Sequence, residues 1–174
     1  MFFLQMSGFP GSGKSTLARE ISRELNAVIV DHDVVKSALL ESMAEHQMDT
    51  SASGKIGYCL DWSLVDFYLS QGFPVIFDSP CLYSEMIDKG LALSKKYNAK
   101  YKYVECIAKD AHVVNKRLKE RDKMVSQITA ISSEESFYKT IESSAKPKDI
   151  SILQIDTLQP LEEYLAEVIS YVKG

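Results

Sequence analysis

Two hydrophobic patterns alternate along the chain. The first is a short, continuous apolar run, which is typical of a parallel strand covered on both faces. Such runs lie at residues 2–7, 27–30, 74–77, 101–107 and 152–155. The second pattern repeats apolar residues every three or four positions, which is the spacing of an amphipathic helix. It predicts helices at residues 14–25, 34–43, 60–68, 84–97, 110–118 and 161–169.

Strands that alternate with helices of this length predict an α/β fold, with a five-stranded parallel sheet between two helix layers. Two segments break the alternation. Residues 47–57 are polar and rich in turn formers, and we expect them to form a mobile connection. Residues 122–134 carry several serines with little hydrophobic periodicity, and we expect them to form a flexible lid.

Length and composition narrow the class of protein. A chain of 174 residues fits one domain, residues 1–174. A net charge of −4 argues against a nucleic-acid partner, because a phosphate backbone attracts proteins with an excess of positive charge. It does not exclude a local basic cleft. Three cysteines without a C-x-x-C pair predict neither a disulfide nor a zinc site and fit a reducing cytoplasm. No stretch reaches about 18 consecutive apolar residues, so no membrane association is expected. The hydrophobic pattern does not indicate an oligomeric state.

A glycine-rich loop between the first strand and the first helix matches G-x-x-x-x-G-K-[ST]. Its glycines let successive backbone N–H groups point at phosphate oxygens, and the following helix presents its positive end to the same anion. Lys14 is expected to reach the terminal phosphates of ATP and the Ser15 hydroxyl to bind Mg²⁺. The predicted nucleotide-binding residues are Gly8, Gly11, Ser12, Gly13, Lys14, Ser15 and Thr16. A chance glycine-rich turn is the alternative, which the strand–loop–helix context disfavours.

An acidic pair, Asp31 and Asp33, follows the second strand. The carboxyl ends of parallel strands line the ligand crevice of such sheets, and a carboxylate there can orient an acceptor hydroxyl and take its proton. One of the two acids is expected to cap the next helix. We assign Asp33 to the acceptor site as base, with Asp31 as the alternative, and Lys36 one turn later as a substrate contact. His32 is expected to be a partly exposed turn residue.

A second acid, Asp78, ends the third strand, in the position of the acid that holds Mg²⁺ through water in phosphate-loop proteins. Arg117 and Arg121 lie four residues apart before the predicted lid, where a guanidinium can pair with phosphate or stack on a purine. The alternative for these arginines is a solvated charged face. Trp62 is expected in the core, with stacking on an acceptor ring as the alternative.

These features, in this order, resemble those of the small P-loop kinases. The group it looks most like contains the polynucleotide 5′-hydroxyl kinase domain, chloramphenicol phosphotransferase and zeta toxins. The resemblance implies sheet order 2-3-1-4-5 and Asp33 as general base. It also implies that Arg117 lies near the adenine, that Arg121 reaches the phosphates from the lid, and that residues 157–160, ending at Pro160, form the other side of the adenine slot. Lys36 stands where the family often has arginine.

The function predicted from these patterns is an ATP- and Mg²⁺-dependent kinase that phosphorylates a hydroxyl of a small molecule. One alternative is a kinase for nucleic-acid 5′ ends or nucleotides, for which four lysines would form a basic edge: Lys95, Lys96, Lys100 and Lys102. A second alternative is a switch protein that binds ATP, hydrolyses it slowly and passes a lid movement to a partner. The role of Asp33 distinguishes a kinase from a switch.

Overall fold

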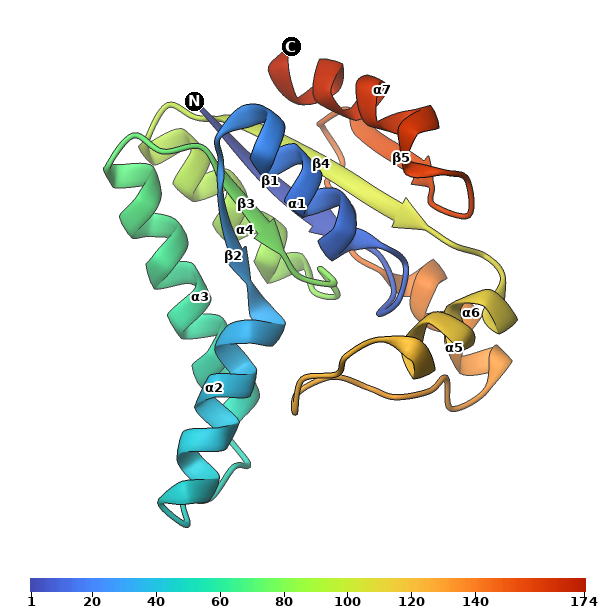
Figure 1. The fold of residues 1–174 in the computed structure, drawn as a ribbon. Helices are drawn as coiled ribbons and strands as arrows, with labels where there is room; N and C mark the ends of the chain where they lie inside the picture. The colour runs from blue at the N-terminus through green and yellow to red at the C-terminus, as the bar shows by residue number, and fades with distance from the viewer.

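A computed structural model describes all residues, 1–174, and contains one parallel five-stranded sheet (Figure 1). Its spatial order is β2-β3-β1-β4-β5, as the resemblance implied. The strands are β1 (Phe2–Ser7), β2 (Val28–Asp31), β3 (Val75–Asp78), β4 (Lys100–Ile107) and β5 (Ile152–Asp156). All pairings are parallel, so the carboxyl ends of the strands meet at one edge of the sheet. The predicted fold class is confirmed.

Seven helices accompany the sheet, and they follow the predicted pattern except at two places. They are α1 (Lys14–Leu25), α2 (His32–Glu45), α3 (Ser53–Ser70), α4 (Ser84–Lys96), α5 (Ala111–Glu120), α6 (Glu134–Ser143) and α7 (Leu161–Lys173). No helix has the length and apolar character needed to cross a membrane.

The central strand β1 is buried on both faces, because helices cover the sheet from both sides. Alternate residues of a strand point to opposite faces. Leu4 therefore packs with apolar residues of α1 and α7, whereas Phe3 packs with apolar residues of α3 and α4. This explains why residues 2–7 carry apolar side chains on both faces of the strand.

The helix α3 begins earlier than the sequence pattern indicated. Residues 53–57 were expected to belong to a mobile connection, but they form the first turns of α3, and only residues 46–52 connect it to α2. Gly57 faces α2 closely: a Cβ at this position would lie 3.5 Å from Cε1 of His32. Close packing between the two helices, which no local pattern reports, stabilises this polar start.

A further helix, α6, was not predicted. Ser133 caps it by accepting a hydrogen bond from the N–H of Ser136, and Glu134 and Glu135 occupy its first turn. Its buried Phe137 contacts Phe9 of the glycine-rich loop, with the ring centroids 4.8 Å apart. The predicted lid is irregular through residue 133, but its last residue, Glu134, is already helical.

The carboxyl edge of the sheet lies between two groups of elements (Figure 1). The pair α2 and α3 projects past it on one side, and α5, α6 and the loop between them lie on the other side. The glycine-rich loop follows β1 directly at this edge. The edge is therefore the place at which the predicted site residues can meet.

Candidate active site

The glycine-rich loop has the backbone conformation that its glycines allow. Gly8, Gly11 and Gly13 all have positive φ, and a Cβ at Gly8 would lie 2.3 Å from the carbonyl oxygen of Cys106. Only glycine fits this position without moving the backbone of β4. The loop is also held from the far side, because Thr157 Oγ1 donates a hydrogen bond to the Ser12 carbonyl oxygen at 2.6 Å.

The loop ends at the amino end of α1, which has no side-chain cap and no acidic residue in its first turn. The first N–H groups of a helix lack partners within the helix and favour an anion. Lys14 is buried, and its Nζ donates to the carbonyl oxygens of Gly8 at 2.9 Å and Phe9 at 3.2 Å. Thr16, in the same first turn, is exposed. This arrangement suits a phosphate group.

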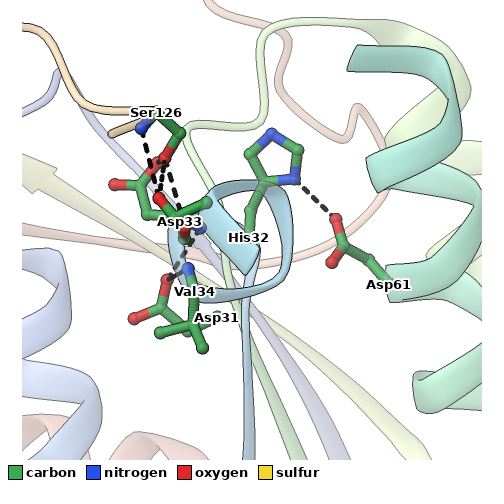
Figure 2. Close-up of polar contacts among 7 residues, drawn as sticks. Asp31, His32, Asp33, Val34, Asp61 and Ser126 are labelled. Atoms are coloured by element: carbon green, nitrogen blue, oxygen red, sulfur yellow. Dashed lines mark hydrogen bonds and ion pairs between the residues drawn. The ribbon is translucent and has the colours of Figure 1, made fainter. Parts of the chain in front are cut away.

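The structure distinguishes the two acids after β2. Asp31 caps α2, because its Oδ1 accepts hydrogen bonds from the N–H groups of Asp33 at 2.9 Å and Val34 at 3.4 Å (Figure 2). The Asp33 carboxylate is not used for capping and points instead to the loop between α5 and α6. There it accepts a hydrogen bond from Gln127 Nε2 at 2.7 Å, and a long one from Ser126 Oγ at 3.5 Å.

Asp78 lies beside Asp31 in the sheet, since the two residues are paired in the β2–β3 register. Burial, with Asp78 as a second cause, raises the pKa of Asp31 to about 6. Burial also raises the pKa of Asp78, and Lys14 and Ser15 oppose this shift. The sheet thus brings two carboxylates together next to the glycine-rich loop.

The predicted metal residues, Ser15 and Asp78, are close enough for the Ser15 hydroxyl to lower the pKa of Asp78. Asp78 is only 4% exposed, and its Oδ2 has no hydrogen-bond partner. A buried carboxylate oxygen without a partner fits a bound cation. No three His, Cys, Asp or Glu side chains converge on a metal position, so a cation here would take its other ligands from water or phosphate oxygens, as Mg²⁺ does.

The two arginines reach different parts of the molecule. Arg117, on α5, donates from Nη2 to the carbonyl oxygen of Thr157 at 2.8 Å, in the loop that leads to Pro160 at the start of α7. Arg121 follows the last residue of α5 and donates from Nη2 to the carbonyl oxygen of Ile128, at 2.9 Å, within the predicted lid. Its Nε is buried without a partner.

His32 differs from its expected environment. It was expected to be a partly exposed turn residue, but it is the first residue of α2 and only 6% exposed. Its Nδ1 lies 2.6 Å from Oδ2 of Asp61, a residue of α3 that is fully buried (Figure 2). Asp61 carried no signal in the sequence, because an acid in the middle of an amphipathic helix normally faces solvent.

Two other residues singled out by the sequence lie on α2 and α3, and the predicted acceptor contact of Lys36 stays a prediction. Lys36 follows on α2, and its aliphatic stem lies near Gly57 of α3. Trp62 is buried against Phe3 and Phe77, which confirms its expected place in the core.

The four lysines proposed as a basic edge lie away from this site. They are at the end of α4 and the start of β4, at the amino end of the sheet. Lys100 pairs in register with Phe2, whereas Ser7, which precedes the glycine-rich loop, pairs with Glu105. At about 3.3 Å per residue, five residues of strand separate the two ends by roughly 16 Å.

The fold and the glycine-rich loop together define a P-loop nucleoside triphosphatase fold. The family described as an AAA domain (AAA_33) matches residues 4–135, and the chain belongs to this family. A comparison with curated proteins finds no match.

Several solved structures share the fold at low sequence identity. A sugar kinase from Janibacter sp. HTCC2649 is similar with a TM-score of 0.69 and 18% identity, over 99% of this chain and 95% of that one. A gluconokinase from Sinorhizobium meliloti 1021 gives 0.63 and 15%, over 99% and 91%. The APS kinase of Mycobacterium tuberculosis in complex with AMPPNP and APS gives 0.68 and 15%, over 99% and 98%.

Proposed function

We propose that the chain is an ATP- and Mg²⁺-dependent phosphotransferase that moves the γ-phosphate to a hydroxyl of a small-molecule acceptor. The observation that carries this proposal is the Asp33 carboxylate. Asp31 caps α2, so the Asp33 carboxylate is not used for capping. It lies at the carboxyl edge of the sheet, the same edge as the glycine-rich loop, and accepts hydrogen bonds from Ser126 and Gln127. The solved kinases with this fold support the same reaction class.

In this proposal the residues have separate roles. The glycine-rich loop and Lys14 bind the triphosphate. Arg117 and the loop that ends at Pro160 lie on two sides of the adenine ring. Ser15 and Asp78 would hold Mg²⁺, which supplies charge neutralisation on the β- and γ-phosphates when bound. Arg121 lies between α5 and residues 122–134, which act as a lid of the single kinase domain, and it contacts this lid at the carbonyl oxygen of Ile128.

Asp33 acts on the acceptor. Its carboxylate orients the hydroxyl and takes the proton as the oxygen attacks the γ-phosphorus, while Lys36 and Asp31 border the same position. Catalysis is then mainly positioning and charge stabilisation, because a phosphoryl group in transfer needs little covalent help. The finer likeness to polynucleotide kinase, chloramphenicol phosphotransferase and zeta toxins remains part of this proposal. The remote lysines do not favour a nucleic-acid acceptor.

The test is ADP release across a panel of hydroxyl metabolites, antibiotics, nucleosides and 5′-hydroxyl oligonucleotides. Asp33→Asn is expected to abolish transfer and to leave ATP affinity within about twofold, because it removes the base and keeps the shape. Asp88→Asn, an exposed acid on α4, is the matched control. Lys14→Ala is expected to lose the thermal stabilisation by Mg-ATP without unfolding. Unchanged turnover in Asp33→Asn would instead support an ATPase switch.

A further inference from the structure

The buried histidine at the start of α2 is packed on three sides. Its Nδ1 lies 2.6 Å from Asp61 Oδ2, and its ring stacks on Tyr58 with centroids 4.1 Å apart and planes 10° from parallel. Gly57 of α3 lies on the third side of the ring, where a Cβ would be in van der Waals contact with Cε1 at 3.5 Å. The imidazole of His32 is therefore held in one orientation.

The contact with Asp61 determines which ring nitrogen carries the proton. An ionised carboxylate can only accept a hydrogen bond, so Nδ1 donates and Nε2 of the neutral ring is left with its lone pair. Nε2 points away from Asp61 and has no hydrogen-bond partner in the chain (Figure 2). Although the ring is buried, Nε2 is not fully enclosed by protein atoms. A buried ring thus offers one accessible acceptor atom.

The residue that carries this acceptor atom directly precedes the proposed base in the chain. His32 and Asp33 are consecutive residues, with Cα atoms about 3.8 Å apart, in the first turn of α2. Their side chains lie on two sides of that turn, His32 toward α3 and Asp33 toward the lid (Figure 2). A ligand that contacts both residues needs hydroxyl groups spaced along its length. Nε2 requires a donor, and the Asp33 carboxylate accepts a hydrogen bond from Gln127; two hydroxyl groups on one molecule satisfy both once that amide is displaced.

The charged residues around His32 and Asp33 restrict the charge that the acceptor can carry. The chain has four arginines, Arg19, Arg23, Arg117 and Arg121, so α2, α3 and the segment between β3 and α4 contain none. A bidentate clamp for a carboxylate, sulfate or phosphate on the acceptor is therefore missing on this side. Four carboxylates lie on this side, Asp31, Asp33, Asp61 and Asp78, whereas α2 and α3 carry two lysines, Lys36 and Lys55. Lys14 and Arg19, which lower the pKa of Asp78, belong to α1 beside the glycine-rich loop. An uncharged acceptor fits this balance, and an anionic one does not.

We infer that His32 Nε2 binds a second hydroxyl of a neutral polyhydroxylated acceptor, a sugar or polyol, whose reacting hydroxyl is bound by Asp33. Asp61 is the positioning residue that sets the tautomer and orientation of His32. This inference deepens the proposed function and rests on it for the role of Asp33. It adds the class of acceptor and two residues that select it.

Binding can be tested without turnover. The chain has three histidines, so the Cε1–H resonance of His32 is assigned by its loss in His32→Asn. In the presence of Mg-ADP we expect this resonance to shift on addition of at least one of glycerol, erythritol, xylitol, glucose or inositol, and not with gluconate. The shift should be absent in Asp61→Asn. No shift with any of these neutral compounds, or a shift with gluconate alone, overturns the inference.

Kinetics separate a selecting residue from a structural one. For the neutral acceptor that works best, His32→Asn and Asp61→Asn are expected to raise KM at least tenfold, with kcat and the KM for Mg-ATP within about twofold. The deoxy analogue that lacks the hydroxyl bound by His32 should raise the KM of the wild-type chain by the same factor. The same analogue should cause no further rise in the KM of His32→Asn. His46→Asn, at an exposed position, is the control. Equal losses on all deoxy analogues would mean that His32 is only structural.

The two proposals fail in different ways. If Asp33→Asn leaves turnover unchanged but the His32 resonance still responds to polyols, the kinase proposal fails and the polyol-binding site remains. If phosphoryl transfer occurs only to a sugar acid or a nucleotide, and without dependence on His32, the kinase proposal remains and the assigned acceptor class is wrong.

Discussion

Gln127 Nε2 donates a hydrogen bond to Asp33 Oδ2 at 2.7 Å, so a side chain of the predicted lid, residues 122–134, covers the carboxylate that we propose as the base. Ser126 reinforces this contact: its Oγ donates to the Asp33 carbonyl oxygen at 3.1 Å, and its N–H donates to Ser37 Oγ at 3.1 Å. The lid thus lies on the first turns of α2. An acceptor hydroxyl has to displace the Gln127 amide to reach Asp33.

Removing this amide is expected to help the acceptor bind. A hydrogen bond to a half-buried carboxylate contributes about 1 kcal/mol, so Gln127→Ala should lower the KM for the acceptor roughly fivefold. Gln154→Ala is a matched control, because it removes an amide–carboxylate contact with Glu105 at 2.6 Å on the β4–β5 side of the sheet. Steady-state kinetics with saturating Mg-ATP measure both. An unchanged or higher acceptor KM in Gln127→Ala would mean that the contact does not compete with the acceptor.

Asp78 is expected to control the Mg²⁺ requirement. Because its Oδ2 is buried without a partner, Asp78→Asn should raise the Mg²⁺ concentration for half-maximal nucleotide binding about tenfold or more. The same change removes a charge that burial disfavours, so the melting temperature without Mg²⁺ should not fall. The Mg²⁺ concentration for half-maximal binding is measured by calorimetry, in a titration of Mg²⁺ at a fixed ATP concentration. Asp66→Asn, which changes a half-exposed acid paired with Lys96, should leave the Mg²⁺ dependence unaltered.

Asp31 makes stability depend on pH in a defined direction. Its pKa is raised from 3.8 to about 6 in the folded chain, chiefly by burial, so between these values the folded chain holds a proton that the unfolded chain has lost. Stability from this group is therefore lost as the pH rises through that window. Asp31→Asn keeps an oxygen that can cap α2 but removes the charge.

We expect Asp31→Asn to match the wild type near pH 4 and to be more stable by about 1–2 kcal/mol at pH 7, after allowance for solvent screening at this half-buried position. Urea unfolding from pH 4 to 7.5 measures the difference. A gap between the two proteins that stays constant over this range would contradict a raised pKa.

Two glycines give opposite expectations for the same substitution. Gly8→Ala should lower the free energy of unfolding by about 2 kcal/mol or more, because φ is +132° and the new Cβ would lie 2.3 Å from a backbone oxygen of β4. Gly54→Ala, in the first turn of α3, meets nothing within 4 Å and should be neutral or stabilising by up to about 1 kcal/mol. Chemical denaturation of both variants is the comparison. Equal effects would refute the close approach of the loop to Cys106.

Local patterns were enough for most of the fold. The apolar runs and the helical spacing predicted the strands and six of the seven helices, since both periodicities arise from neighbouring residues. The helix α6 was missed although Ser133, Glu134 and Glu135 form a start signal, because its ten residues contain only three large apolar side chains, Phe137, Tyr138 and Ile141. The start of α3 was missed because its stability comes from packing on α2.

In the candidate site, too, some features followed from local sequence patterns and others depended on the tertiary structure. The residues at the carboxyl edge followed from the order of strands and from one specific loop motif, because parallel strands bring their ends to one edge. The choice of cap could not follow from sequence, since Asp31 and Asp33 cap a helix equally well. The backbone decided it: Asp31 is the last extended residue, with φ −101° and ψ 114°.

By its sequence alone this chain is an α/β domain with a phosphate-binding loop and acids after its second and third strands, because these signals depend on residues close together in the chain. The pairing of His32 with Asp61 joins residues 29 positions apart, and that of Asp33 with Gln127 joins residues 94 apart. Neither pair has a local signal. Only the packing of α3 and of the lid against the first turn of α2 brings these groups together.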